Sequence, residues 1–266
     1  MTVPRPDDDA LRYAFEHDGA ELVVEEQGAG ARVFVLIHGI GMGRTVFGGL
    51  VPALVPHGRV IAMDQPGYGE APEPPRTPTM ARTADIVAGL LRTRARADAA
   101  EIVVIGHSMG TQVATELAVR HPHLVDRLVL LAPTVDPSAR SAAAQLLRLG
   151  RDLLAESPKV LITGGREYLR AGPNLRRKMK AMLSHRPEDR YPSVAAPTLV
   201  VRGAEDVVCP RPWCAQVTSA IPAATFAEIP GHRHETMIRD ARPTASLVLG
   251  FVGAGLPSAL PDAGDG

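Results

Sequence analysis

The chain has 266 residues, which is enough for one large hydrophobic core and ordinary for a single α/β domain. Basic and acidic residues balance at 29 each, which argues against an electrostatic nucleic-acid binder, and no apolar run approaches the roughly 18 residues that a membrane helix needs. The first nine residues hold three consecutive aspartates and no apolar core of a signal peptide. We therefore expect a cytoplasmic protein without nucleic-acid or membrane partners.

Apolar runs bounded by turn residues predict the first strands of a buried sheet. Residues 22–24 form a short run, and residues 32–37 form a continuous one, as in a strand that is buried on both faces. A glycine-rich loop and a short helix over 50–55 are expected next, followed by a buried strand at 60–63. Apolar residues at helical spacing then predict a helix over 77–96.

The apolar run at 102–105 leads directly into the pentapeptide GHSMG at 106–110. A GxSxG pattern between a β-branched strand and a helical pattern is typical of a nucleophile elbow, in which the serine occupies a sharp, strained turn. We expect glycine at both ends because a Cβ there would collide with the neighbouring strand or helix. The sequence thus predicts that Ser108 projects from the edge of a sheet.

Further strands are expected at 128–131, 198–201 and 225–229. Strands that alternate with helices in this way predict an α/β fold with a mostly parallel central sheet. The alternation breaks over 136–192, where the pattern is helical and residues 160–162 are the one strand candidate, so we expect a small helical cap there. Residues 1–135 and 193–254 would form the core, and residues 255–266, rich in Gly, Pro and Asp, would be disordered.

A serine hydroxyl at neutral pH needs an adjacent base, and that base must be oriented by a third group. Asp206 lies just beyond the strand expected at 198–201, and His234 lies just beyond the last strand. Loops that follow parallel strands emerge at the same edge of a sheet, so these side chains can meet Ser108. The sequence predicts a catalytic triad of Ser108, Asp206 and His234.

From about residue 32 to residue 253 the chain resembles the serine-type α/β-hydrolase family. The segments HGIG at 38–41, DQPGYG at 64–69, GAED at 203–206 and IPGHRH at 229–234 match the family's loop after the third strand, its DxPGxG turn, its acid loop and its histidine loop. The chain departs at Glu70-Ala71, where relatives have a small serine. The resemblance implies an oxyanion hole formed by the backbone N–H groups of Ile40 and Met109, and it implies no metal, nucleotide or flavin cofactor.

Two histidines compete as the base of the triad. His234 fits the family pattern better than His232 does, because it stands three residues after the glycine and has the apolar Met237 three residues further on. His107, inside the elbow, and His38 are expected to support the site rather than to react.

The acid also has rivals, Asp136 and Glu205. Asp206 ends a GxxD segment, as the family's acid does. Asp136 precedes a proline, so it can equally well be the N-terminal cap of a helix. Cys209 and Cys214 are five residues apart, which is the wrong spacing for a CxxC redox or zinc pair, so we expect reduced, structural thiols.

The resemblance implies a serine hydrolase that cleaves an ester-type or related acyl bond of a small molecule. Residues 137–190 hold twelve Lys or Arg against five Asp or Glu. The simplest interpretation of this surplus is a solvated outer face. If a cap arginine, Arg166 or Arg170, instead binds a substrate carboxylate, a carbon–carbon bond hydrolase acting on carboxylated dienoic ring-fission products is the alternative. A non-catalytic small-molecule receptor of the same fold is a third hypothesis.

Overall fold

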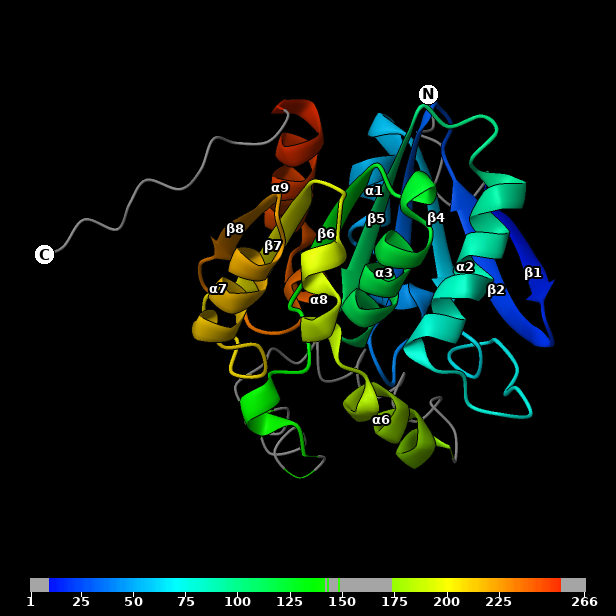
Figure 1. Ribbon diagram of the computed structural model, residues 1–266. Coiled ribbons are helices and arrows are strands. Elements are labelled where there is room, and N and C mark those ends of the chain that lie inside the picture. The colour runs from blue at the N-terminus through cyan, green and yellow to red at the C-terminus, as the bar shows by residue number, and fades with distance from the viewer. Residues whose placement is uncertain (1–9, 142, 144–147, 149–173, 255–266) are drawn as a thin grey trace, which may run out of the picture.

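The computed structural model describes residues 10–141, 143, 148 and 174–254. Within this part of the chain, one sheet holds the strands in the order β1-β2-β4-β3-β5-β6-β7-β8 (Figure 1). β1 and β2 are antiparallel to their neighbours, whereas β4, β3 and β5 to β8 run parallel. The strands are β1 (Leu11–His17), β2 (Ala20–Gln27), β3 (Arg32–Ile37), β4 (Arg59–Asp64), β5 (Glu101–His107), β6 (Arg127–Leu131), β7 (Thr198–Gly203) and β8 (Ala224–Ile229). The predicted α/β fold with a mostly parallel sheet is confirmed.

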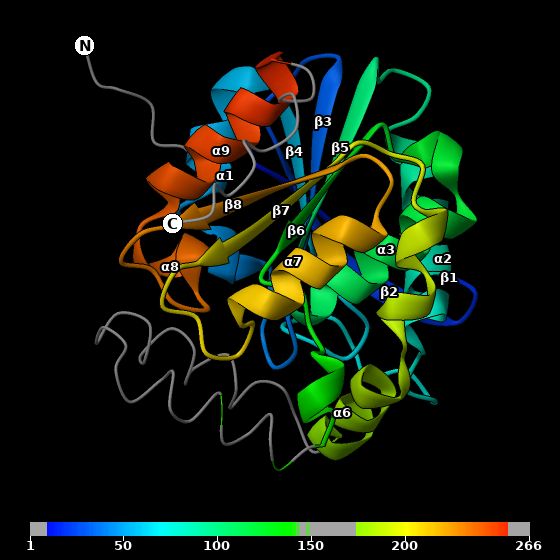
Figure 2. The same ribbon diagram turned by 60° about the vertical axis from the view of Figure 1, so that its left-hand side comes forward.

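Helices cover both faces of the sheet (Figure 2). The described α-helices are α1 (Val51–Leu54), α2 (Met80–Arg94), α3 (Met109–Arg120), α6 (Leu175–Ser184), α7 (Arg211–Ala220), α8 (Thr236–Arg239) and α9 (Ala241–Ala254). Helices α2, α3 and α7 pack on one face, and α1, α8 and α9 pack on the other. Short 3-10 turns complete the described elements: η1 (Arg44–Phe47), η2 (Val55–His57), η3 (Pro122–Leu124), η4 (Pro137–Ala139), η5 (Pro187–Asp189) and η6 (Tyr191–Ser193). None of the helices described here is long and apolar enough to cross a membrane.

The central strands are continuous apolar runs because each of them feeds two cores. In β3, Val33 and Val35 pack with the α2 and α3 side, while Phe34 and Leu36 pack with the α1 and α9 side. Successive side chains of a strand point to opposite faces, so a strand between two helical layers has no position for a solvated residue.

Two element boundaries differ from the sequence prediction. The helix expected over 77–96 is α2, which begins at Met80 because the Thr79 hydroxyl accepts a hydrogen bond from the backbone N–H of Arg82 and caps the helix. The short helix expected over 50–55 is the single turn α1, which the 3-10 turn η2 continues directly.

The predicted cap over 136–192 lies partly outside the described residues, as do the strand candidate at 160–162, Arg166, Arg170 and the tail at 255–266. Helix α6 belongs to the described part and lies beyond the edge of the sheet at which the parallel strands end (Figures 1 and 2). Its Lys178 reaches the turn that follows β4. The division of the chain into core and cap stays a prediction.

Candidate active site

Ser108 occupies the sharp turn between β5 and α3. Its φ of 52° lies in the left-handed region, which non-glycine residues rarely adopt and which is often found at functional sites. A Cβ on Gly106 would lie 2.5 Å from the carbonyl oxygen of Gly110, and a Cβ on Gly110 would lie 2.1 Å from that of Ile37 in β3. Glycine is therefore required at both positions, because the backbone of α3 lies too close to Gly106, and that of β3 too close to Gly110, for a side chain. The sequence predicts this requirement.

Three side chains from three loops meet at the carboxyl edge of the sheet. The Nε2 atom of His234 lies 3.0 Å from the Ser108 hydroxyl oxygen, and its Nδ1 atom lies 2.9 Å from Oδ2 of Asp206. All three residues are buried. Since a carboxylate only accepts, Nδ1 donates to Asp206, and Nε2 of the neutral ring then accepts from the serine hydroxyl. This is the arrangement in which a histidine can act as a general base.

The second carboxylate oxygen of Asp206 is also held. Oδ1 accepts from the backbone N–H groups of Val208 at 2.7 Å and Cys209 at 2.8 Å. The buried guanidinium of Arg202, at the end of β7, donates to the carbonyl oxygens of Asp206 and Cys209. Sequence reasoning did not identify Arg202, although a charged residue inside the otherwise apolar run LVVRG was a signal.

The rival acids lie elsewhere. Asp136 is the N-terminal cap of η4: it accepts from the backbone N–H and the hydroxyl of Ser138 and pairs with Arg148 at 2.8 Å. Glu205 is half exposed and faces Arg233 at 3.4 Å. Asp206 is the acid that the structure brings to His234.

The rival histidines also have other partners. Nδ1 of His232 donates to the carbonyl oxygen of Pro230 in its own loop. His38 is fully buried, and burial lowers its pKa, so the ring is neutral. Its Nε2 accepts from the backbone N–H of Gln65 at 3.1 Å, and its Nδ1 donates to the carbonyl oxygen of Gly39. His38 thus fixes its own loop, the supporting role that the sequence predicts.

The loop that carries Ile40 lies against the elbow. A Cβ on Gly39 would lie 3.0 Å from the Cβ of Ser108, so this backbone passes directly beside the serine. Met109 is the first residue of α3 and follows the serine. Met109 therefore adjoins Ser108 directly, and Ile40 follows the glycine that passes beside the serine, while their role as an oxyanion hole stays a prediction.

His107 joins the elbow to the histidine loop. Its Nε2 donates to the carbonyl oxygen of His234 at 3.1 Å, and burial holds its pKa well below the usual 6.5. Among the described residues, His107, His234 and Glu235 place possible metal-ligand atoms within 4.8 Å of one another. Both ring nitrogens of His234 already bind Asp206 and Ser108, so we interpret this group as part of the hydrogen-bonded site.

Two basic side chains, Arg44 and Lys178, bind the end of β4 and the turn after it through contacts that the sequence did not predict. Glu70, at the departure from the family pattern, pairs with Arg44 at 3.2 Å, and Arg44 also pairs with Asp64. Lys178 of α6 is almost completely buried: it donates to the carbonyl oxygen of Gly67 and lies 2.9 Å from Glu73. Of the neighbouring basic residues, Arg176 and Arg177 are exposed, as expected of a solvated face, whereas Lys178 lines a small pocket with Tyr68 and Met109.

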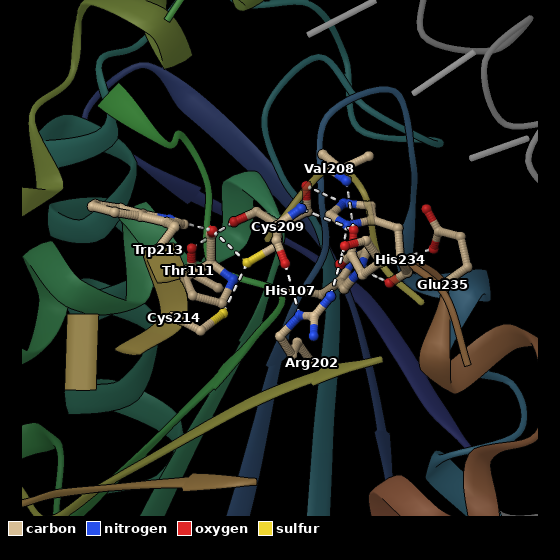
Figure 3. Close-up of polar contacts among 12 residues, drawn as sticks. His107, Thr111, Arg202, Val208, Cys209, Trp213, Cys214, His234 and Glu235 are labelled. Carbon is tan, nitrogen blue, oxygen red and sulfur yellow. Dashed lines mark hydrogen bonds and ion pairs between the residues drawn. The ribbon is translucent and has the colours of Figure 1, made fainter. Parts of the chain in front are cut away.

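Cys209 and Cys214 are both buried and are not joined by a disulfide in this structure. The Sγ atom of Cys209 donates to the carbonyl oxygen of Pro133 at 3.1 Å, and the indole N–H of Trp213 donates to the same oxygen (Figure 3). These residues join the acid loop and α7 to the segment that follows β6.

The chain is similar to proteins of known class over most of its length. A family model described as alpha/beta hydrolase fold matches residues 32–157. The protein named 2-(acetamidomethylene)succinate hydrolase from Mesorhizobium japonicum is 25% identical over 260 residues, covering 88% of this chain and 92% of its own.

Among the solved structures with a similar fold are an esterase and an enol-lactonase. A thermophilic esterase from Thermogutta terrifontis has a TM-score of 0.76 at 24% identity, over 92% of this chain and 98% of its own. An enol-lactonase from Burkholderia xenovorans has a TM-score of 0.76 at 22% identity, over 90% of this chain and 99% of its own.

Proposed function

The chain belongs to the α/β-hydrolase family and is a hydrolytic enzyme, and from this premise we propose that it is a serine hydrolase that cleaves an ester-type or related acyl bond of a small molecule. One observation carries the proposal: the hydrogen-bonded path from Asp206 through His234 to Ser108, with contacts of 2.9 and 3.0 Å. The names of the similar structures, an esterase and an enol-lactonase, support acyl bonds as the substrate class.

In the acylation step, the Ser108 hydroxyl attacks the substrate carbonyl carbon while Nε2 of His234 takes its proton. Asp206 stabilises the resulting imidazolium through Nδ1–H and keeps the ring in the required orientation. Two contacts support this role for the serine: its hydroxyl oxygen lies 3.0 Å from Nε2 of His234, and its Cβ lies beside Gly39, which precedes Ile40.

The tetrahedral oxyanion would be bound by the backbone N–H groups of Met109 and Ile40. In enzymes of this kind, losing one such donor costs roughly 3–4 kcal/mol of transition-state stabilisation. His234 then returns the proton to the leaving group, and a water activated by the same histidine releases the acyl group from Ser108. This cycle uses only side chains and backbone groups of the chain.

The test measures hydrolysis of p-nitrophenyl esters of graded acyl length by the native protein and by Ser108→Ala, His234→Ala and Asp136→Asn. We expect turnover on short acyl chains that is lost in the first two variants and retained in Asp136→Asn, which removes the rival acid. A fluorophosphonate probe should label the native serine and leave Ser108→Ala unlabelled.

Two results would contradict the proposal. Turnover that survives Ser108→Ala would show that another residue is the nucleophile. If the native protein turns over none of the esters but bleaches a coloured carboxylated dienoate in a Ser108-dependent way, the enzyme is a carbon–carbon bond hydrolase instead.

A further inference from the structure

Two thiols contact each other next to the candidate acid, Asp206. Cys209 belongs to the loop between β7 and α7, and Cys214 to the first turn of α7, with both side chains buried and their Sγ atoms 3.1 Å apart (Figure 3). Sulfur atoms in a disulfide are about 2.05 Å apart, so closing this pair requires an approach of only about 1 Å.

Two sets of hydrogen bonds connect Cys209 to the candidate acid, Asp206. Its backbone N–H donates to Oδ1 of Asp206 at 2.8 Å. Arg202 donates to the carbonyl oxygens of Asp206 and Cys209 at 2.7 and 2.8 Å, which joins the two residues a second time. A displacement of the Cys209 backbone is therefore transmitted to the carboxylate that orients His234.

The thiol proton itself makes a contact that oxidation would remove. The Sγ atom of Cys209 donates to the carbonyl oxygen of Pro133, in the segment that follows β6. A disulfide sulfur has no proton to donate, so bond formation both draws Cys209 toward Cys214 and releases it from Pro133. Both changes act on the loop that holds Asp206.

We propose that Cys209 and Cys214 are an oxidation site for small hydroperoxides, and that the disulfide they form lowers hydrolytic turnover by displacing Asp206. The formation of the disulfide is independent of the enzyme's reaction, whereas its effect on turnover rests on the proposed function.

The chemistry balances with one hydroperoxide. A thiol sulfur attacks the O–O bond of hydrogen peroxide, which breaks to give a sulfenic acid and one water. The second thiol sulfur attacks the sulfenic sulfur, the S–O bond breaks, and a second water leaves as the S–S bond forms. The two thiols together lose two electrons and two protons, and the peroxide is reduced to two waters.

Burial determines which oxidants react. The Cys209 thiol is shielded from solvent, and burial raises its pKa, so it is protonated and reacts slowly. Val207 of the same loop is 40% exposed, which places the loop at the surface. We expect that hydrogen peroxide reaches the pair, whereas a bulky aromatic disulfide reagent does not react with the folded protein.

The experiment treats the full chain with graded hydrogen peroxide and follows intact mass, free thiols and ester turnover. We expect a loss of about 2 Da, the two hydrogen atoms of the thiols. Turnover should fall at least about tenfold with little change in KM, as expected for weakening a hydrogen bond to a charged group, and dithiothreitol should restore mass and turnover. Oxidation of methionine instead adds about 16 Da, which dithiothreitol does not reverse.

Cys214→Ala and Cys214→Ser are the matched controls, and using both guards against a variant that is destabilised by the substitution. Each should show native turnover before treatment and neither the mass loss nor the reversible inhibition afterwards. Native protein that stays folded and keeps both thiols under peroxide overturns the proposal. A disulfide that leaves kcat unchanged overturns its coupling to Asp206. If the native chain hydrolyses no ester at all, the proposed function fails, and the mass measurement still decides whether the disulfide forms.

Discussion

The guanidinium of Arg202 donates to the backbone carbonyl oxygen of Asp206 at 2.7 Å, while the carboxylate of Asp206 is held by other groups. The backbone and the side chain of the candidate acid are thus fixed separately. Arg202 also pairs with Glu228 of β8, so the position of the acid depends on contact between β7 and β8.

This relationship predicts that Arg202→Met lowers kcat about tenfold or more with little change in KM, because the acid loop loses two donors. Losing these hydrogen bonds and the part-buried ion pair with Glu228 should also lower the free energy of unfolding by about 1–3 kcal/mol. Arg211→Met is the matched control: Arg211 faces the same Glu228 at 3.3 Å but is exposed, so its loss should change stability by less than about 1 kcal/mol. Steady-state kinetics and urea unfolding test both variants, and equal effects would refute a special role for Arg202.

The elbow predicts opposite outcomes for two Gly→Ala substitutions. Gly110→Ala should abolish activity and destabilise the fold by more than about 3 kcal/mol, because the new Cβ would lie 2.1 Å from the carbonyl oxygen of Ile37. Gly250 lies in α9 with nothing within 4 Å of its Cβ position, so Gly250→Ala should stabilise by about 0.5–1 kcal/mol. Thermal unfolding of both variants checks this, and an active, stable Gly110→Ala protein would contradict the observed backbone approach.

Two buried histidines predict a loss of stability on the acid side of neutrality. Burial lowers the pKa of His38 and His107 below their usual 6.5, so below this pH the unfolded chain binds protons that the folded chain does not. Stability should therefore fall as the pH falls from 6.5, by up to about 1.4 kcal/mol per pH unit for each histidine. Urea unfolding at about pH 7.5 and about pH 5.5 measures this.

The comparison variant is His107→Gln, which keeps an N–H donor for the carbonyl oxygen of His234 and has no titrating group. Its stability should fall less steeply over the same pH interval. An unchanged slope would mean that His107 is protonated in the folded protein as readily as in the unfolded one.

The buried lysine of α6 predicts unequal effects for two neighbouring basic residues. Lys178→Met removes the donor to the carbonyl oxygen of Gly67 and the partner of Glu73, so we expect a loss of about 1–3 kcal/mol in the free energy of unfolding. Arg176→Met, at an exposed position of the same helix, should stay within about 0.5 kcal/mol of the native value. Chemical unfolding measures both, and similar losses would show that the burial of Lys178 contributes nothing.

The central strands and the meeting of Ser108, Asp206 and His234 were predictable because they depend on local patterns and on sheet topology. Continuous apolar runs identify strands that lie between two helical layers, and loops after parallel strands converge at one edge. Strand β1 (Leu11–His17) was not predicted: it pairs on one side only and exposes alternate residues, so it has no continuous apolar run.

Lys178 and Arg202 show why the remaining contacts could not be predicted. A charged side chain becomes buried only when partners far away in the sequence satisfy it, as Gly67 and Glu73 satisfy Lys178. The run of basic residues around Lys178 instead suggests a solvated face. Its neighbours Arg176 and Arg177 do face solvent, whereas Lys178 does not. Such pairings depend on tertiary structure and leave no local periodicity.

Strand β6 lies between β5, which precedes Ser108, and β7, which precedes Asp206. The chain leaves the sheet at the end of β6 and returns at the start of β7, and the parallel pairing of Leu128 with Thr198 through Leu131 with Val201 holds those two strands in fixed register. The spacing of the strand ends that carry the nucleophile and the acid is therefore set by pairing within the sheet, through a strand that contributes no member of the candidate triad.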